Sequence, residues 1–190
     1  MGESGFGQAL FGLGLSYGVT SGMKYRDFIS NKELVDKMYK ASLVLYHKEG
    51  GHNKFLESIQ IWLDISAPLF AWNEMDTYRV GETKQSESTM HTLLKTPFTQ
   101  NMFEKPIEGN YLVYLESQRL KGGLEISVED MKNALPCGYL QRREWNFNYK
   151  VLRNIIYQRK KHRLSQWKSF CTFMYENVEH PEYFSDLFDK

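Results

Sequence analysis

The feature that most constrains the fold of this chain is an alternating apolar run that passes directly into a helix start. Apolar residues recur at every second position from 59 to 65, which is the period of a half-buried β-strand, and Phe55 falls on the same face although Glu57 interrupts it. Ser66 and Pro68 follow, and proline is tolerated in the first turn of a helix. We therefore expect a strand over 55–65 and a helix over 67–79 immediately after it.

Further helices are predicted on both sides of this strand and helix. Asn31 is a typical N-cap, and apolar residues follow it at helical spacing until a pair of glycines ends the pattern near residue 50. Ser127 and Asp130 have the spacing of a capping box, which opens a short helix. Two more apolar stripes predict two helices within 148–178, and the hydroxyl-rich stretch 81–89 predicts a loop. The fold class is α/β.

Composition excludes several classes of protein. The 190 residues are 42% hydrophobic and 15% aromatic with a net charge of +1, which excludes a disordered or collagen-like chain and any strong overall attraction to nucleic acid or anionic membranes. No stretch approaches the roughly 18 apolar residues that span a bilayer, and no export signal is recognised, so we expect a soluble, cytoplasmic protein. Two cysteines and five scattered histidines predict reduced structural thiols and no metal site.

The ends of the chain differ from its middle. Seven glycines lie between Gly2 and Gly22, but no strand precedes them and no Gly-Lys-Ser/Thr follows, which argues against a phosphate loop. We expect a Gly-rich N-terminal arm over 1–30, a single domain over 31–178 and an acidic C-terminal tail over 179–190.

Reactive side chains gather between residues 62 and 91. One interpretation is that these residues bind a phosphorylated ligand, with an arginine guanidinium forming two hydrogen bonds to the phosphate and hydroxyl groups donating others. The residues concerned are Tyr78, Arg79, Lys84, Ser86, Ser88 and Thr89. The alternative is a surface ion ladder of Asp76, Arg79 and Glu82, if the helix persists that far. A hydrolase is disfavoured because no elbow glycines surround Ser86.

A basic window covers residues 141–168, with nine basic residues against one acid, Glu144. A phosphate pocket shared between subunits and a solvated face balanced by the acidic tail explain it equally well. A nucleic-acid surface ranks third, because the whole chain is close to neutral.

Several short segments, taken in order, resemble the flavin-dependent thymidylate synthases (ThyX-like proteins). They span about residues 50 to 170 and comprise Gly51-His52-Asn53-Lys54-Phe55-Leu56-Glu57 before a strand ending Asp64-Ile65-Ser66, Leu135-Pro136, Asn148-x-Lys150-x-Leu152-x-x-Ile155, Arg159 and Ser165-Gln166-Trp167. The first segment is similar to the H-x-S-x-x-E-H of that family, and the later ones to its N-x-R-x-L-x-x-F, R and A-Q-W series.

The family signature R-H-R-x-x-S-x-N-E-x-S-x-R-Y is largely lost. Alignment on Ser86 places Asp76, Thr77 and Tyr78 at R-H-R, and only Ser86 is retained. The resemblance implies that the R-H-R triplet contacts the flavin and that the second serine and the arginine after it approach the uridylate. The lost residues are therefore those that would hold cofactor and substrate charge. Lys150, in place of an arginine, keeps the charge but not the planar fork.

The resemblance implies an α/β (α+β) single domain with helices packed on a small sheet, assembled as a homotetramer with ligand sites where subunits meet. It also implies a pyrimidine nucleotide such as dUMP as ligand and FAD as cofactor. NADPH and methylenetetrahydrofolate follow only if the family activity, methylation of the uracil ring, is retained.

The resemblance also assigns roles to residues. Ser86 is the candidate catalytic residue; the candidate nucleotide-binding residues are Arg79, Ser86, Ser88 and Arg159; and the candidate cofactor-binding residues are His52, Tyr78, Asn148 and Lys150. For His52, a buried pair with Glu57 that supports the strand is an equal alternative.

Three functions remain open at this point. The first is a divergent thymidylate synthase-like enzyme. The second is a non-catalytic nucleotide sensor or sequestering protein on the same fold, suggested by the loss of R-H-R. The third is an interaction or structural protein, suggested by the Gly-rich arm and the many aromatic residues.

Overall fold

The computed structural model describes residues 1–48, 50–122 and 125–188, and the chain divides into two compact units. Unit 1 comprises Met1–Leu63, Val80–Thr83 and Trp145–Lys190. Unit 2 comprises Asp64–Arg79 and Lys84–Glu144.

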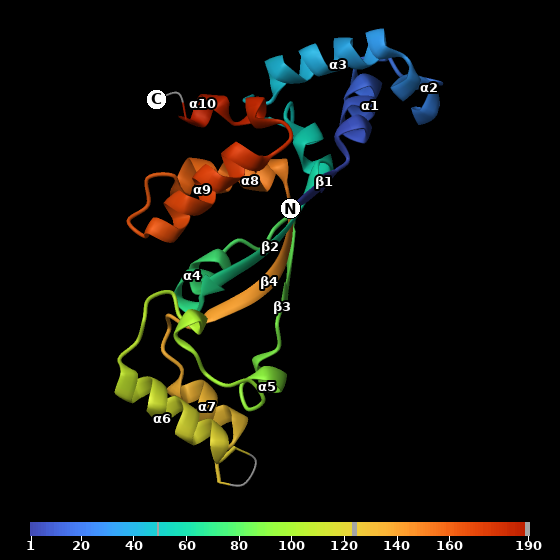
Figure 1. Ribbon diagram of the computed structural model, residues 1–190. Coiled ribbons are helices and arrows are strands. Elements are labelled where there is room, and N and C mark those ends of the chain that lie inside the picture. Colours follow the sequence, from blue (N-terminus) through green and yellow to red (C-terminus); the bar gives the residue numbers. More distant parts are fainter. Residues whose placement is uncertain (49, 123–124, 189–190) are drawn as a thin grey trace. The chain divides into compact units, whose positions relative to one another are not determined.

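A four-stranded sheet has the strand order β1-β2-β4-β3 (Figure 1). Its strands are β1 (Gly2–Ser4), β2 (Gln60–Pro68), β3 (Glu82–Ser86) and β4 (Leu140–Asn148). β1 runs antiparallel to β2, with Glu3 opposite Ile61. The chain passes between the units within β2, β3 and β4, so each of these strands contributes residues to both.

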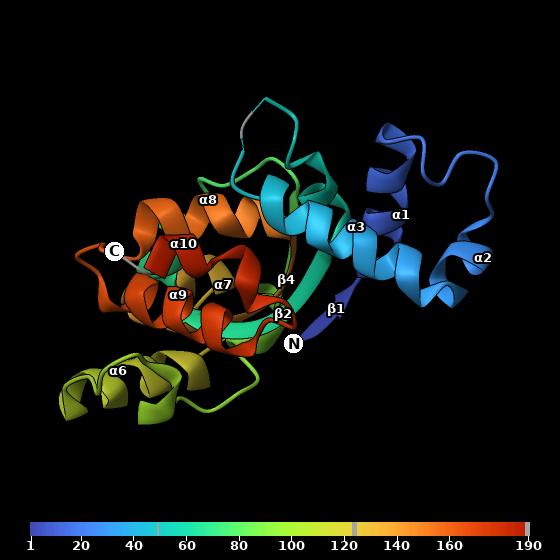
Figure 2. The ribbon, with the colours of Figure 1, turned by 90° about the horizontal axis from the view of Figure 1, so that it is seen from above.

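Unit 1 is mainly helical outside its strand segments. Its helices are α1 (Phe6–Ser16), α2 (Tyr25–Ser30), α3 (Lys32–Leu45), the 3₁₀ helix η1 (Lys54–Ser58), α8 (Tyr149–Arg159), α9 (Ser165–Asn177), the 3₁₀ helix η3 (Pro181–Tyr183) and α10 (Ser185–Phe188). The first three pack around Leu10, Phe28 and Met38. Figures 1 and 2 show α8 and α9 side by side. Trp145, at the end of β4, stacks on Phe170 of α9 with ring centroids 5.5 Å apart.

Unit 2 has its own apolar core. Its helices are α4 (Leu69–Met75), α5 (Thr89–Thr92), the 3₁₀ helix η2 (Gln100–Met102), α6 (Gly109–Leu120) and α7 (Val128–Ala134). Helices α6 and α7 lie in contact (Figure 1). The buried core residues are Leu93, Phe98, Phe103, Leu115, Met131 and Tyr139.

The mixed fold class and several helices are confirmed. Asn31 caps α3 by accepting a hydrogen bond from the Leu34 N–H at 3.2 Å. The reciprocal capping box of Ser127 and Asp130 opens α7. The two helices predicted within 148–178 are α8 and α9. The domain boundaries at residues 30 and 178 stay predictions, and residues 189–190 of the expected acidic tail lie outside the described residues.

The predicted strand over 55–65 is wrong in its first half. Residues 54–58 form η1, and β2 begins at Gln60 and continues to Pro68. Phe55 and Leu56 are both buried although they are consecutive, and a strand would place one of them on its opposite face. The interruption of the apolar face at Glu57 marks this change of structure.

The predicted loop over 81–89 and the ion ladder are also wrong. Glu82–Ser86 form the edge strand β3, whose polar residues carry no apolar alternation to signal it. The ladder does not form because α4 ends at Met75 rather than continuing to residue 79. Asp76 instead accepts two hydrogen bonds from Arg143 Nη1 at 2.9 and 3.0 Å.

Three further features concern binding in general. Within the described residues, no helix has the length and apolar character needed to cross a membrane, and no three acidic, histidine or cysteine side chains gather as a metal site would require. Cys137 and Cys171 are both free, and burial raises the pKa of the Cys171 thiol to about 12.

The capping box of α7 gives a stability prediction. Replacing Ser127 by Ala removes the hydroxyl that accepts from the Asp130 N–H and should lower the free energy of unfolding by about 1 kcal/mol. Urea denaturation followed by circular dichroism measures it. The matched control is Ser169→Ala, at an exposed position inside α9, which should change stability by only a few tenths of a kcal/mol. Equal losses in the two variants would contradict the capping role.

Candidate functional site

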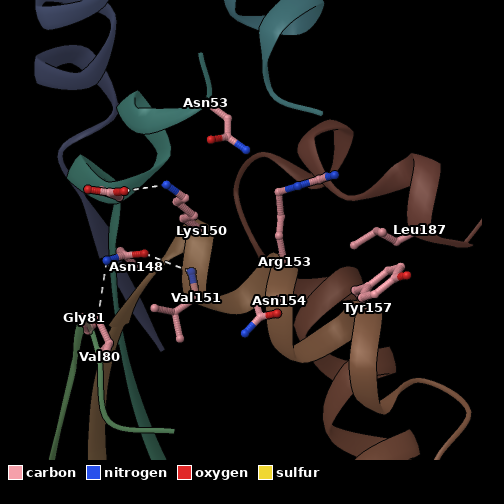
Figure 3. Close-up of a pocket in the computed structure, with 11 residues that line it drawn as sticks. Asn53, Val80, Gly81, Asn148, Lys150, Val151, Arg153, Asn154, Tyr157 and Leu187 are labelled. Carbon is pink, nitrogen blue, oxygen red and sulfur yellow. Dashed lines mark hydrogen bonds and ion pairs between the residues drawn. The ribbon is translucent and has the colours of Figure 1, made fainter. Parts of the chain in front are cut away.

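A cavity of about 640 Å³ lies within unit 1 at the start of α8. We call it the α8 pocket. Its walls come from the loop before η1, η1 itself, the residues before β3, α8, and α10 (Figure 3). The lining residues are Asn53, Glu57, Val80, Gly81, Asn148, Lys150, Val151, Arg153, Asn154, Tyr157 and Leu187.

Asn148 fixes the base of the pocket. Its Oδ1 accepts a hydrogen bond from the Val151 N–H at 3.0 Å and so caps α8, while its Nδ2 donates to the Gly81 carbonyl at 3.4 Å. Gly81 has φ +73°, and a Cβ there would lie 3.0 Å from Asn148 Nδ2 and 3.2 Å from Val151 Cγ2. Position 81 therefore requires glycine on both conformational and steric grounds.

Lys150 and Glu57 form an ion pair at one side of the pocket. Lys150 Nζ lies 2.6 Å from Glu57 Oε1, and the two side chains are 38% and 44% exposed. A pair this exposed contributes little stability, at most about 1 kcal/mol. The pair can therefore open at low cost when a ligand competes for either partner.

Arg153 is held much more firmly. Its guanidinium forms two hydrogen bonds to the Asp186 carboxylate at 2.9 and 3.0 Å, donates to the Tyr183 carbonyl, and lies over the Tyr46 ring at 4.9 Å from the centroid. Partial burial raises the pKa of Asp186, but its hydrogen bonds and ion pair with Arg153 outweigh burial and lower the pKa below its usual value. The Arg153 side chain is therefore held in one position at the pocket wall, and its charge is balanced by Asp186.

Asn53 is the unusual residue of the pocket. It is only 4% exposed, and its Oδ1 is buried without a hydrogen-bond partner among the described residues. Leaving a buried amide oxygen unpaired costs about 1–3 kcal/mol. In Figure 3 its carboxamide points into the space toward which Lys150 and Arg153 extend.

The structure brings two of the predicted cofactor residues, Asn148 and Lys150, into the α8 pocket. His52 lies elsewhere in unit 1, exposed, in a separate hollow lined by α1, η1 and the loop before η1. Arg159, at the end of α8, holds its guanidinium 5.0 Å from the Trp167 ring centroid. The buried pair of His52 with Glu57 is wrong, because both residues are exposed and Glu57 pairs with Lys150.

The other predicted site residues belong to unit 2. Ser86 ends β3 and lines a hollow of about 430 Å³ together with Asp64 and Arg142, which form an ion pair. Ser88 lies at the start of α5 and is exposed. Arg79 is exposed, and its Nε donates to the Asp76 carbonyl at 3.4 Å. The Tyr78 carbonyl accepts from Lys84 Nζ at 3.3 Å. The functional roles of these residues stay predictions.

Of the eleven residues that line the pocket, the sequence predicted only Asn148 and Lys150 as binding residues. The others include Asn53, Arg153, Asn154 and Tyr157. Positions 150, 153, 154 and 157 recur at helical spacing on α8, so the face they share follows from the Asn148 cap. Asn53 carries no comparable sequence signal, because its burial depends on how η1 packs.

The pair of Arg153 and Asp186 gives a pH prediction. A carboxyl group whose pKa is lowered in the folded state contributes stability that is present above its unfolded-state pKa, about 3.9, and is lost as the pH falls through the lower, folded-state value. Unfolding free energies of the wild type should therefore decline below about pH 4. In Asp186→Asn this part of the decline should disappear, measured by urea denaturation between pH 2.5 and 6. If the unfolding free energy of Asp186→Asn falls with pH as steeply as that of the wild type, the Arg153–Asp186 pair is not the cause of the decline.

Comparisons with known proteins bear on the fold. No protein-family model matches the sequence, and no curated protein matches it. Solved structures do match along nearly the whole chain. Two are of the flavin-dependent thymidylate synthase ThyX from Helicobacter pylori with FAD and dUMP, both 15% identical, with TM-scores of 0.77 and 0.74. The alignments cover 100% and 98% of this chain, and 97% and 96% of the respective ThyX chains.

A third matching structure is the UMP/dUMP methylase PolB from Streptomyces cacaoi bound with 5-Br dUMP. It is 12% identical, with a TM-score of 0.64, and the alignment covers 100% of this chain and 92% of PolB. The arrangement of helices around a small sheet and the match over whole chains agree with the expectation drawn from the sequence. This chain has the fold of the flavin-dependent thymidylate synthases.

Proposed function

We propose that this protein is a divergent thymidylate synthase-like protein that binds a pyrimidine nucleotide such as dUMP and holds a flavin ring in the α8 pocket. The observation that carries the proposal is that Asn148 and Lys150, the two downstream residues assigned to cofactor binding, line one pocket. The named ligands of the matching structures, FAD with dUMP and 5-Br dUMP, add support.

The α8 pocket fits a flavin ring better than it fits a free phosphate. Its volume of about 640 Å³ is in the usual range of small-molecule sites, and Val80, Val151 and Leu187 provide apolar walls. The Oδ1 of Asn53 has no hydrogen-bond partner among the described residues and could accept a hydrogen bond from a ligand. Lys150 and Arg153, by contrast, each already have a carboxylate partner. A bound flavin would supply hydride-transfer chemistry.

The rest of the proposal follows the assigned roles. Ser86, Ser88, Arg79 and Arg159 contact the nucleotide, and His52 and Tyr78 serve the cofactor. The assembly is a homotetramer that brings residues of different subunits to each site. NADPH and methylenetetrahydrofolate are co-substrates if the chain retains methylation activity.

A second function, nucleotide binding without catalysis, is favoured by the contacts of Asp76. This residue stands where the resemblance expects the first arginine of R-H-R, and its carboxylate binds Arg143 at 2.9 Å and lies 3.8 Å from Lys84. Because the resemblance assigns this triplet to the flavin, an acid at this position disfavours the anionic cofactor and removes no residue assigned to the nucleotide. The alternative is a sensor or sequestering protein.

The binding proposal predicts that the purified protein binds both FAD and dUMP. Lys150→Met should weaken FAD binding about tenfold, because Lys150 can leave its exposed ion pair with Glu57 and form a charge-assisted contact with FAD, worth roughly 1.5–3 kcal/mol. Fluorescence titration of FAD and calorimetric titration of dUMP measure the two affinities.

Lys40→Met is the matched control, since Lys40 is an exposed α3 residue paired with Asp36. It should leave both affinities unchanged. Absence of binding for both ligands would refute the proposed function.

The catalytic form of the proposal predicts tritium release from [5-³H]dUMP when FAD, NADPH and methylenetetrahydrofolate are supplied. Ser86→Ala should abolish release, whereas Ser117→Ala, at a half-buried position of α6 that carries no assigned role, should retain it. If the wild type binds dUMP and releases no tritium, the catalytic form is wrong and the non-catalytic binding protein is the function.

A further inference from the structure

We propose that Asn53 is a specificity-determining residue of the α8 pocket and that it pairs with the imide edge of a uracil-type or flavin-type ring. The inference rests on the proposed function and goes beyond it. In the family motif H-x-S-x-x-E-H, Asn53 falls on the variable position x that follows the histidine, so the resemblance assigns it no role.

The carboxamide oxygen of Asn53 is buried and unpaired within the described part of the chain. This Oδ1 is excluded from water and accepts no hydrogen bond from any described residue. Buried polar groups are nearly always paired, and an exception marks a site for a missing water, ion or ligand. Oδ1 itself is turned away from solvent, but Asn53 lines the pocket and its carboxamide lies at the pocket wall (Figure 3), so a ligand bound there is the partner that a turn of this carboxamide would bring to Oδ1.

The backbone holds this side chain in position. The Asn53 carbonyl accepts a hydrogen bond from the Leu56 N–H at 3.1 Å, which begins η1, and Phe55 and Leu56 anchor that turn in the interior. Only the last side-chain torsion remains soft, as in all asparagines. Rotation about this torsion turns Oδ1 toward the ligand while the backbone stays fixed.

A carboxamide offers one acceptor and one donor side by side, and an imide offers an N–H beside a carbonyl, so the two form a pair of hydrogen bonds. A phosphate or carboxylate presents acceptors alone and leaves Oδ1 unpaired. Uracil and the flavin isoalloxazine ring both carry such an imide.

Lys150 is paired with Glu57, and Arg153 with Asp186, so the cations near Asn53 are compensated. An uncharged ring edge therefore suits this part of the pocket better than an anion does. The carboxamide of Asn53 therefore determines which ligand binds more than Lys150 and Arg153 do.

The test compares ligands with and without the imide proton in wild type and Asn53→Ala. The probes are riboflavin and N3-methylriboflavin for the flavin source, and dUMP and N3-methyl-dUMP for the pyrimidine source, each titrated by calorimetry. In the wild type, N3-methylation should weaken binding at least tenfold for one of the two ring types, either the flavin or the uracil. In Asn53→Ala the parent ring should bind about as weakly as its methylated form. The ring that shows this loss of discrimination is the one that occupies the pocket.

Asn177→Ala is the matched control, since it removes an exposed amide of α9 that does not line the pocket and should leave the discrimination intact. Asn53→Leu tests the unpaired amide without a ligand. It should unfold at or above the wild-type temperature, because an apolar side chain leaves no unpaired atom behind.

Two results overturn the inference, and they differ from failure of the proposed function. Equal wild-type affinity for the parent and methylated forms of both rings, or discrimination that survives Asn53→Ala, shows that Asn53 does not read the imide although the ring binds. If no probe binds the wild type, the proposed function itself fails and the inference falls with it.

Discussion

The α8 pocket depends on one buried asparagine, Asn148, where β4 passes directly into α8. Its oxygen caps the helix and its amide nitrogen holds the Gly81 carbonyl, so a single side chain fixes the direction of α8 and the backbone that precedes β3. With α8 so directed, its first turns present Lys150 and Arg153 to the pocket. Replacing Asn148 by an apolar residue would disturb all of these positions together, because an apolar side chain cannot accept the hydrogen bond from the first turn of α8.

The pocket combines neutralised charges with an unsatisfied amide. Glu57 and Asp186 balance Lys150 and Arg153, whereas the buried Oδ1 of Asn53 has no hydrogen-bond partner among the described residues. Such a site recognises hydrogen-bond pattern more than net charge. This difference separates a pocket for a planar ring from one for a phosphate.

Sequence patterns predicted what local physical chemistry determines. The caps at Asn31 and Ser127 announce α3 and α7 because each satisfies backbone donors within its own turn. The edge strand β3 was missed because its stability comes from pairing with a distant strand rather than from its own polar residues. For the site, Asn148 and Lys150 followed from an ordered motif, whereas the burial of Asn53 arises from packing between segments far apart in sequence, which no local pattern encodes.

The central claim is that the α8 pocket holds the ring of a flavin or of a pyrimidine nucleotide. A crystal structure of the protein grown with FAD and dUMP tests it most directly. The account predicts electron density for one ring inside this pocket, with its imide edge against the Asn53 carboxamide. Density for both ligands at other sites, with neither ring reaching Asn53, would contradict it.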